Sequence, residues 1–140
     1  RLDGPMAAEP KTKPTDVPVE DFIAAVDNPT RRADALVVRD MLAEVTGEQA
    51  VMWGPSIIGY GSYRGPTGDW PIVGFSPRKA NTVLYVLGFP GQDELLARLG
   101  KHKTGNACLY ITRLSDVDLG VLREIAERSV AHTRAGKAGC

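Results

Sequence analysis

Apolar residues recur at helical spacing in two neighbouring segments near the start of the chain. Residues 16–26 place Phe22 and Ile23 on one face of a short helix. A second helix is expected to begin after Asn28, whose side chain suits an N-cap, and to end at Gly47. Its apolar stripe consists of Leu36, Val37, Met41, Leu42 and Val45. The pattern therefore predicts a pair of helices.

From Met52 onward the pattern changes to short runs of aromatic and β-branched residues separated by glycine and proline. Such runs are typical of strands. Their connections are short enough for an antiparallel meander. The predicted strands are 57–63, 72–76 and 82–87, and the predicted links are 65–69 and 77–81.

The remaining pattern predicts a helix over 92–99, a strand over 107–113 and a closing helix over 118–132. The closing helix has a core-facing stripe of Leu119, Leu122, Ile125, Ala126 and Val130. The order of elements is ααβββαβα. We therefore expect an α+β fold in which helices pack on one face of a mostly antiparallel sheet of four or more strands. The other face of the sheet is expected to be partly open.

The length of 140 residues suits one domain with its own hydrophobic core. We place this domain at 16–134. Residues 1–15 are rich in Pro, Lys and Ala and lack periodicity, so we expect a disordered tail whose start is consistent with a cloning remnant. Residues 135–140 are expected to form a flexible tail.

Charge and cysteine usage narrow the classes of function. The 17 basic and 17 acidic residues give no net charge, which argues against a dedicated nucleic-acid binder. No apolar run reaches the roughly 20 residues that span a bilayer, and the N-terminus lacks a signal-peptide core. Cys108 lies in a strand pattern and Cys140 ends the chain, so no disulfide is expected. These features favour a cytoplasmic protein with no membrane partner.

Several short motifs stand in order along the chain. They are Trp53-Gly54-Pro55, Phe75-Ser76-Pro77-Arg78-Lys79, Leu84-Tyr85, Gly100-Lys101-His102-Lys103-Thr104-Gly105, Cys108-Leu109-Tyr110 and Asp116-Val117-Asp118-Leu119. Together they resemble the YdhG-like family of small bacterial proteins of unknown function, over nearly all of residues 17–130. The resemblance implies an α+β fold similar to the frataxins. For the family's namesake it also implies a role as an intracellular iron chaperone.

An iron-handling role requires oxygen ligands, and the second predicted helix offers some. Asp40, Glu44 and Glu48 recur every four residues, and the first two share a helix face. Acidic groups near a helix C-terminus oppose the helix dipole, which hints at another reason for their placement. These three residues are the candidate ligands, and weakly bound iron is the candidate cofactor. The alternative is an ordinary solvated helix face.

The loop 100–105 is a candidate anion site, because glycines bound a basic segment with a hydroxyl. Its candidate donors are Lys101, His102, Lys103 and Thr104. The loop connects a helix to a strand, which is the opposite polarity to a Walker A loop. The structural alternative is that Gly100 forms a left-handed helix cap while the basic side chains complement the helix dipole.

Aromatic residues that neighbour glycines suggest a pocket on the sheet. Gly59 and Gly61 are expected to leave one strand face free of side chains. The candidate lining residues are Trp53, Tyr60, Phe75, Tyr85 and Tyr110, with Lys79 or Lys101 as a polar anchor. The alternative is that these aromatics belong to the core and its rim.

No catalytic motif stands out. No Gly-x-Ser-x-Gly elbow occurs, and His102 and His132, the two histidines, show no zinc-site spacing. The sequence therefore favours a non-enzymatic binding protein, with iron-chaperone-like activity implied by the resemblance. The alternative is a module that binds a small anionic ligand, a nucleotide or an acidic protein partner through the loop 100–105 and the aromatic face. The oligomeric state is not predicted.

Overall fold

The computed structural model describes residues 14–65 and 68–136. The predicted tails therefore lie largely outside the described residues, as does Cys140. The last two residues of the predicted N-terminal tail are described and lie beside the sheet. Pro14 forms an isolated bridge with Trp53, and the Thr15 amide donates a hydrogen bond to the Met52 carbonyl at 2.8 Å.

The described helices are α1 (Val19–Ala24), α2 (Pro29–Thr46), α3 (Gln92–Leu99) and α4 (Leu119–Arg134), with a short 3-10 turn η1 (Leu114–Asp116) before α4. The predicted N-cap of α2 is confirmed, because the Asn28 side chain accepts a hydrogen bond from the Arg31 amide at 3.0 Å. Gly47 ends this helix in the left-handed conformation. Asp118 caps α4 in the same way as Asn28 caps α2, through the Val121 amide.

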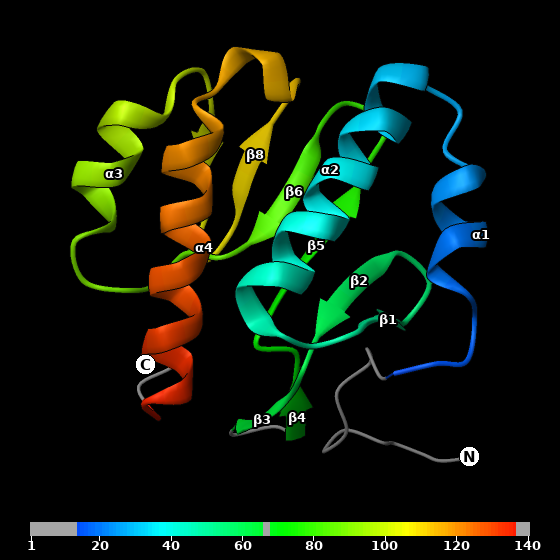
Figure 1. Cartoon of the computed structure of the whole chain (residues 1–140), viewed down its shortest axis with the longest axis horizontal. Coiled ribbons are helices and arrows are strands. Elements are labelled where there is room, and N and C mark those ends of the chain that lie inside the picture. The colour runs from blue at the N-terminus through cyan, green and yellow to red at the C-terminus, as the bar shows by residue number, and fades with distance from the viewer. Residues whose placement is uncertain (1–13, 66–67, 137–140) are drawn as a thin grey trace.

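The main sheet is antiparallel throughout and has the strand order β1-β2-β5-β6-β8-β7 (Figure 1). Its strands are β1 (Ala50–Trp53), β2 (Ile57–Tyr60), β5 (Val73–Pro77), β6 (Thr82–Tyr85), β7 (Lys103–Thr104) and β8 (Leu109–Ile111). A separate hairpin pairs β3 (Tyr63–Gly65) with β4 (Gly68–Trp70). The predicted α+β fold with a mostly antiparallel sheet is therefore confirmed.

Three predicted strands are shorter in the structure, because 57–63, 82–87 and 107–113 correspond to β2, β6 and β8. The strand predicted over 57–63 ends at Tyr60, because Gly61 turns the chain with a φ of 62°. The chain then enters the β3–β4 hairpin, which the sequence reading treated partly as a link. The strands β1 and β7 were not predicted, since they are four and two residues long and lack a clear alternating pattern.

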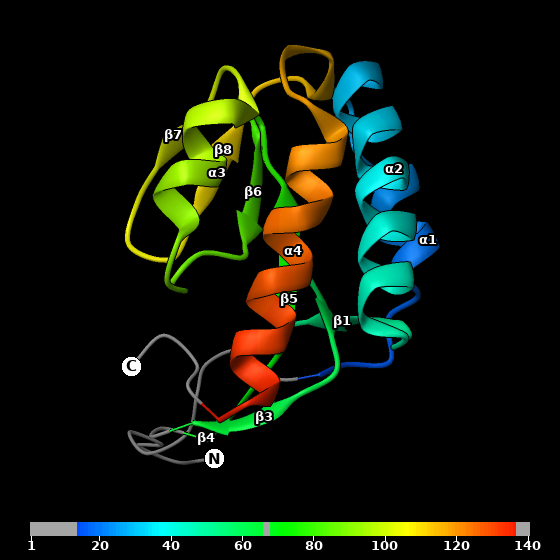
Figure 2. The same cartoon turned by 60° about the vertical axis from the view of Figure 1, so that its left-hand side comes forward.

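The core lies between one face of the sheet and the helices, and Figure 2 shows α2 and α4 lying side by side along this face. Alternation along the strands turns Ile58, Phe75 and Leu84 toward the helices, where they are fully or almost fully buried. They meet Leu42 from α2 and Leu122 from α4 in a single cluster. Burial of this apolar surface is the main force that holds the layers together.

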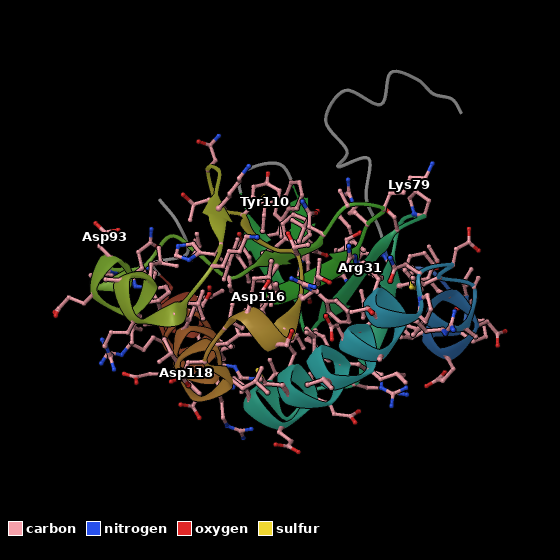
Figure 3. All side chains as sticks on the ribbon, turned by 90° about the horizontal axis from the view of Figure 1, so that it is seen from above. Arg31, Lys79, Asp93, Tyr110, Asp116 and Asp118 are labelled. Carbon is pink, nitrogen blue, oxygen red and sulfur yellow. The ribbon has the colours of Figure 1, made fainter. Side chains whose placement is uncertain are left out.

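The face of the sheet that points away from the helices is called the open face below. Its residues alternate with the core residues of each strand. From the register they are Val51, Trp53, Ile57, Gly59, Gly74, Ser76, Val83, Tyr85 and Tyr110. Figure 3 shows Tyr110 and Lys79 on the side of the molecule opposite to the helices.

Candidate functional site

A pocket of about 260 Å³ lies at one end of the sheet. Its lining residues come in part from the β3–β4 hairpin, the end of β6 and the last turns of α4. Figure 2 shows the hairpin next to the C-terminal end of α4. The pocket wall is mostly aromatic and aliphatic, with two hydroxyls from α4. The lining residues are Tyr63, Trp70, Tyr85, Ile57, Pro71, Ile72, Leu87, Ala107, Ser129 and Thr133. We call this cavity the apolar pocket.

Glycines shape the wall of the apolar pocket that the hairpin supplies. A Cβ added at Gly65 would come within 2.5 Å of the Trp70 indole, so the ring lies against the glycine backbone. Trp70 is paired in register with Tyr63 across the hairpin. The Ile72 amide then donates to the Tyr60 carbonyl at 3.0 Å, which returns the chain to the sheet. The hairpin thus presents two aromatic side chains to the pocket.

Two paired glycines lie on the open face, beside residues that line the pocket. Gly59 of β2 is in register with Gly74 of β5. A Cβ at Gly59 would come within 2.5 Å of the Trp53 indole and 2.8 Å of the Pro71 ring. The surface left free of side chains is therefore filled by Trp53 and Pro71. Gly61, which the sequence placed on the same surface, instead forms the turn after β2.

Arg78 lies next to Tyr85 on the open face, and its side chain is held by two hydrogen bonds. Nη2 donates to the Tyr85 hydroxyl at 3.1 Å, and Nε donates to the Ser76 Oγ at 2.9 Å. The backbone is also fixed, because the Arg78 amide donates to the Asn81 carbonyl and its carbonyl accepts from Arg31 Nε at 3.0 Å. The guanidinium of Arg78 is thus exposed and fixed in orientation.

Tyr110 of β8 lies on the same face as Tyr85. A hydrogen bond with Cys108 is the main cause that raises the pKa of Tyr110, and the charge of Arg78 acts in the opposite direction. Tyr110 is in register with Lys103 of β7. The loop 100–105 therefore borders the open face through Lys103.

The five aromatic residues proposed from the sequence separate into two groups. Tyr85 lines the apolar pocket, and Tyr110 lies beside it on the open face. Tyr60 and Phe75 are fully buried on the helix side of the sheet, where the Tyr60 hydroxyl donates to the Arg39 carbonyl at 2.7 Å. Trp53 is 3% exposed over Gly59. The structure thus brings only Tyr85 of these five into the wall of this pocket.

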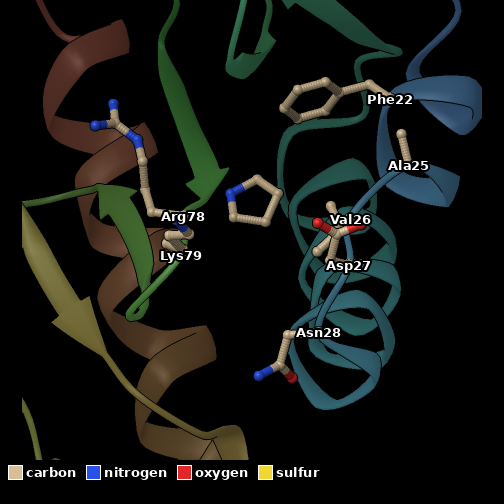
Figure 4. Close-up of a pocket in the computed structure, with 8 residues that line it drawn as sticks. Phe22, Ala25, Val26, Asp27, Asn28, Arg78 and Lys79 are labelled. Atoms are coloured by element: carbon tan, nitrogen blue, oxygen red, sulfur yellow. The ribbon is translucent and has the colours of Figure 1, made fainter.

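Lys79 borders a different and more open groove of about 510 Å³ (Figure 4). This groove lies between the α1–α2 connection and the β5–β6 turn. Phe22, Ala25, Val26, Asp27, Asn28, Pro77 and Arg78 form the rest of its lining. Figure 4 shows the Arg78 side chain extending away from the residues of α1 and the α1–α2 connection. The two lysines proposed as anchors, Lys79 and Lys101, are therefore not among the residues that line the apolar pocket.

The start of the loop 100–105 is bonded to the segment before α4 through Gly100 and Lys101. Gly100 has a φ of 114° and a ψ of −154°, so the predicted left-handed helix cap is wrong, although only glycine adopts this conformation readily. The Lys101 amide donates to the Asp116 carbonyl at 3.2 Å. His102 Nδ1 lies 2.7 Å from the Gly100 carbonyl oxygen, and Thr104 is exposed at the sheet edge.

Each of the three acidic residues proposed as iron ligands faces an arginine. Asp40 lies 3.0 Å from Arg39, Glu44 lies 2.8 Å from Arg123, and Glu48 lies 3.7 Å from Arg134. The hydrogen bond to Glu44 raises the pKa of Arg123. Across residues 14–65 and 68–136, no three His, Cys, Asp or Glu side chains are grouped so that they could hold a metal ion.

Several residues of the candidate site were missed in the sequence. Arg78 could have been found by continuing the strand alternation from Ser76, two residues earlier. Ser129 and Thr133 are four residues apart, which places them on one face of the closing helix. Tyr63 and Trp70 carried no signal, because only the turn at Gly61 brings the hairpin to this end of the sheet.

Comparison of the chain with protein-family models, curated proteins and solved structures gives no match. Within the part of the chain that the structure describes, no helix is both long and apolar enough to cross a membrane.

Proposed function

We propose that the protein binds a small, largely apolar ligand in the apolar pocket. The observation that carries this proposal is the convergence of Tyr63, Trp70 and Tyr85, from three separate strands, around one cavity. Its volume of about 260 Å³ is slightly below the usual range of roughly 300–1,000 Å³ for ligand sites. The volume suits a molecule of one or two rings.

The chemistry of the wall supports binding more than catalysis. The described lining residues carry no carboxylate, imidazole or amine side chain, and their polar side-chain groups are the hydroxyls of tyrosine, Ser129 and Thr133 and the indole N–H of Trp70. Aromatic walls bind flat apolar groups through buried area and ring stacking. The α4 hydroxyls supply hydrogen bonds that orient a polar substituent. This proposal keeps Tyr85 from the binding-module alternative, but it places the ligand in the apolar pocket and not at the loop 100–105.

The iron-chaperone role implied by the YdhG-like resemblance stays a prediction. Asp40, Glu44 and Glu48 each lie beside an arginine, and among the described residues they do not form a group of three that could hold a metal ion. The apolar pocket is therefore the better-supported site. A titration with ferrous iron in the absence of oxygen tests the iron role separately, with the resonances of these three acids as the readout.

Filling the apolar pocket tests the proposed function. The probe for this test is naphthamide, a neutral two-ring molecule, and its binding would be measured by calorimetry and Trp fluorescence. The variant Thr133→Phe places a ring in the cavity, whereas Ala131→Phe adds the same ring to an exposed position on α4. Thr133→Phe is expected to abolish binding and Ala131→Phe to preserve it. Ala107→Leu, at an exposed lining position, repeats the test from the opposite wall. If the wild type, Thr133→Phe and Ala107→Leu bind naphthamide with equal affinity, the apolar pocket is excluded as the binding site.

A further inference from the structure

An exposed arginine lies one side chain away from the apolar pocket. The ring of Tyr85 lines the pocket, while its hydroxyl accepts a hydrogen bond from Arg78 at 3.1 Å. We propose that the ligand carries an oxyanion at one end and that Arg78 binds it, so the site takes a small amphipathic acid. This inference rests on the proposed function, because the apolar part of that acid occupies the pocket.

Arg78 is prepared to bind an anion by the way its guanidinium is held. The bonds to Tyr85 and Ser76 use one hydrogen of Nη2 and the hydrogen of Nε. Nη1 makes no hydrogen bond to another residue of the described ranges 14–65 and 68–136. A planar guanidinium with free N–H groups matches a carboxylate or phosphate through paired hydrogen bonds. Because the side chain is already ordered, binding costs little conformational entropy.

The charge around Arg78 also favours an anion. None of the ion pairs between described residues involves Arg78, so no described carboxylate neutralises it. Lys103 lies on the same face, in register with Tyr110. The open face therefore presents positive charge next to Tyr85, a residue of the apolar pocket's wall. This combination selects molecules with a hydrophobic body and a negative end.

The neighbouring lysine is a less suitable anchor. Arg78 and Lys79 are adjacent, both line the open groove beside α1, and neither is among the residues that line the apolar pocket. The two residues differ in one contact: Arg78 donates a hydrogen bond to Tyr85, which lines the pocket, and Lys79 does not. Lys79 consequently serves as a matched control, since its replacement removes the same formal charge from the adjacent position.

The test compares naphthoate with naphthamide, which differ only in the charged group. In wild-type protein at low salt, naphthoate is expected to bind at least about tenfold more tightly, the usual effect of a charged hydrogen bond. This preference should disappear in Arg78→Gln, persist in Lys79→Gln, and decrease with added salt. Arg78→Lys keeps the charge without the planar fork, so a partial preference is expected.

The outcomes separate this inference from the proposed function. Equal affinity of the wild type for both probes would overturn the role of Arg78 and leave the pocket intact. A preference that survives Arg78→Gln, or that disappears in Lys79→Gln, would also overturn it. Failure of both probes to bind would remove the proposed function together with this inference. Naphthyl phosphate completes the series: tighter binding than naphthoate assigns a phosphate ligand, and weaker binding assigns a carboxylate.

Discussion

Nη2 of Arg78 donates a hydrogen bond to the Tyr85 hydroxyl at 3.1 Å, and this bond joins two different environments. The tyrosine ring belongs to an apolar cavity, while the arginine is exposed on the open face of the sheet. A molecule seated against Tyr85 therefore meets hydrophobic walls at one end and a fixed cation at the other.

Removing the Tyr85 hydroxyl should weaken binding of the anionic group while leaving binding of the apolar rings nearly unchanged. Tyr85→Phe keeps the ring in the pocket but releases Nη2 of Arg78. We expect the affinity for naphthamide to change less than about twofold and the affinity for naphthoate to fall by about threefold to tenfold. Calorimetry with both probes measures the two effects. Equal losses for the two probes would show that the hydroxyl does not act through Arg78.

Arg31 is 4% exposed and is not among the residues that line the apolar pocket. We nevertheless expect it to hold Arg78 in position. It donates Nε to the Arg78 carbonyl at 3.0 Å and Nη1 to the Thr112 carbonyl at 2.6 Å. Loss of two charged hydrogen bonds predicts that Arg31→Met lowers the free energy of unfolding by about 2–4 kcal/mol.

The same variant, Arg31→Met, should also reduce the preference for naphthoate over naphthamide, because the turn that carries Arg78 loses a restraint. Arg32→Met is the control, since within the described part of the chain the Arg32 side chain bonds only the Val26 carbonyl. Urea denaturation and calorimetry measure the two effects. An unchanged preference in a folded Arg31→Met protein would show that Arg31 has a purely structural role.

The backbone at Gly100 should tolerate no other residue. Its φ of 114° suits glycine, and a Cβ there would collide with the Asp116 carbonyl oxygen. We expect Gly100→Ala to lower the free energy of unfolding by about 3 kcal/mol or more. Gly47→Ala, with a φ of 70° and open space around the new methyl, should cost only about 1 kcal/mol. Similar losses in denaturation experiments on the two variants would contradict this assignment of strain.

The buried hydroxyl of Tyr60 predicts a loss of stability in alkaline solution. Burial raises the pKa of Tyr60 far above its ordinary value of about 10. Above that ordinary value the unfolded chain releases the proton while the folded protein keeps it. The free energy of unfolding should therefore fall by about 1.4 kcal/mol per pH unit through this group.

Comparison with Tyr60→Phe isolates this contribution from those of other groups. The variant loses the bond to the Arg39 carbonyl, which costs about 1 kcal/mol at neutral pH. Above pH of about 10 its stability should decline less steeply than that of the wild type. Parallel declines in a series of denaturation curves would show that Tyr60 ionises normally in the folded state.

Local sequence signals predicted much of the fold. The cap at Asn28 acts within one helix, so local sequence alone reveals it. The predicted apolar stripes were partly wrong, because Leu36 and Val37 of α2 and Leu119 of α4 are exposed, at 40%, 43% and 42%. The turn at Gly61 was not predicted, because a glycine within a strand pattern does not indicate whether the strand continues or ends.

The candidate site was harder to predict, since it depends on pairing between distant segments. Tyr85 was proposed from its residue type, but Arg78 and Trp70 join it only through the register of β5 and β6 and the folding back of the hairpin. Strand register is set by the whole sheet. The acidic residues of α2 show the converse. Helical spacing predicted that Asp40 and Glu44 share a face, whereas Arg123 of α4, the partner of Glu44, could be identified only from the structure.

The central claim is that the apolar pocket binds a ligand, and amide chemical shifts test it most directly. Naphthamide is titrated into the isotopically labelled protein. We predict saturable shifts confined to the pocket wall, with Leu87, Ala107, Ser129 and Thr133 as reporters from both sides. An absence of saturable shifts at these residues, or shifts centred on Asp40, Glu44 and Glu48 instead, would contradict the account.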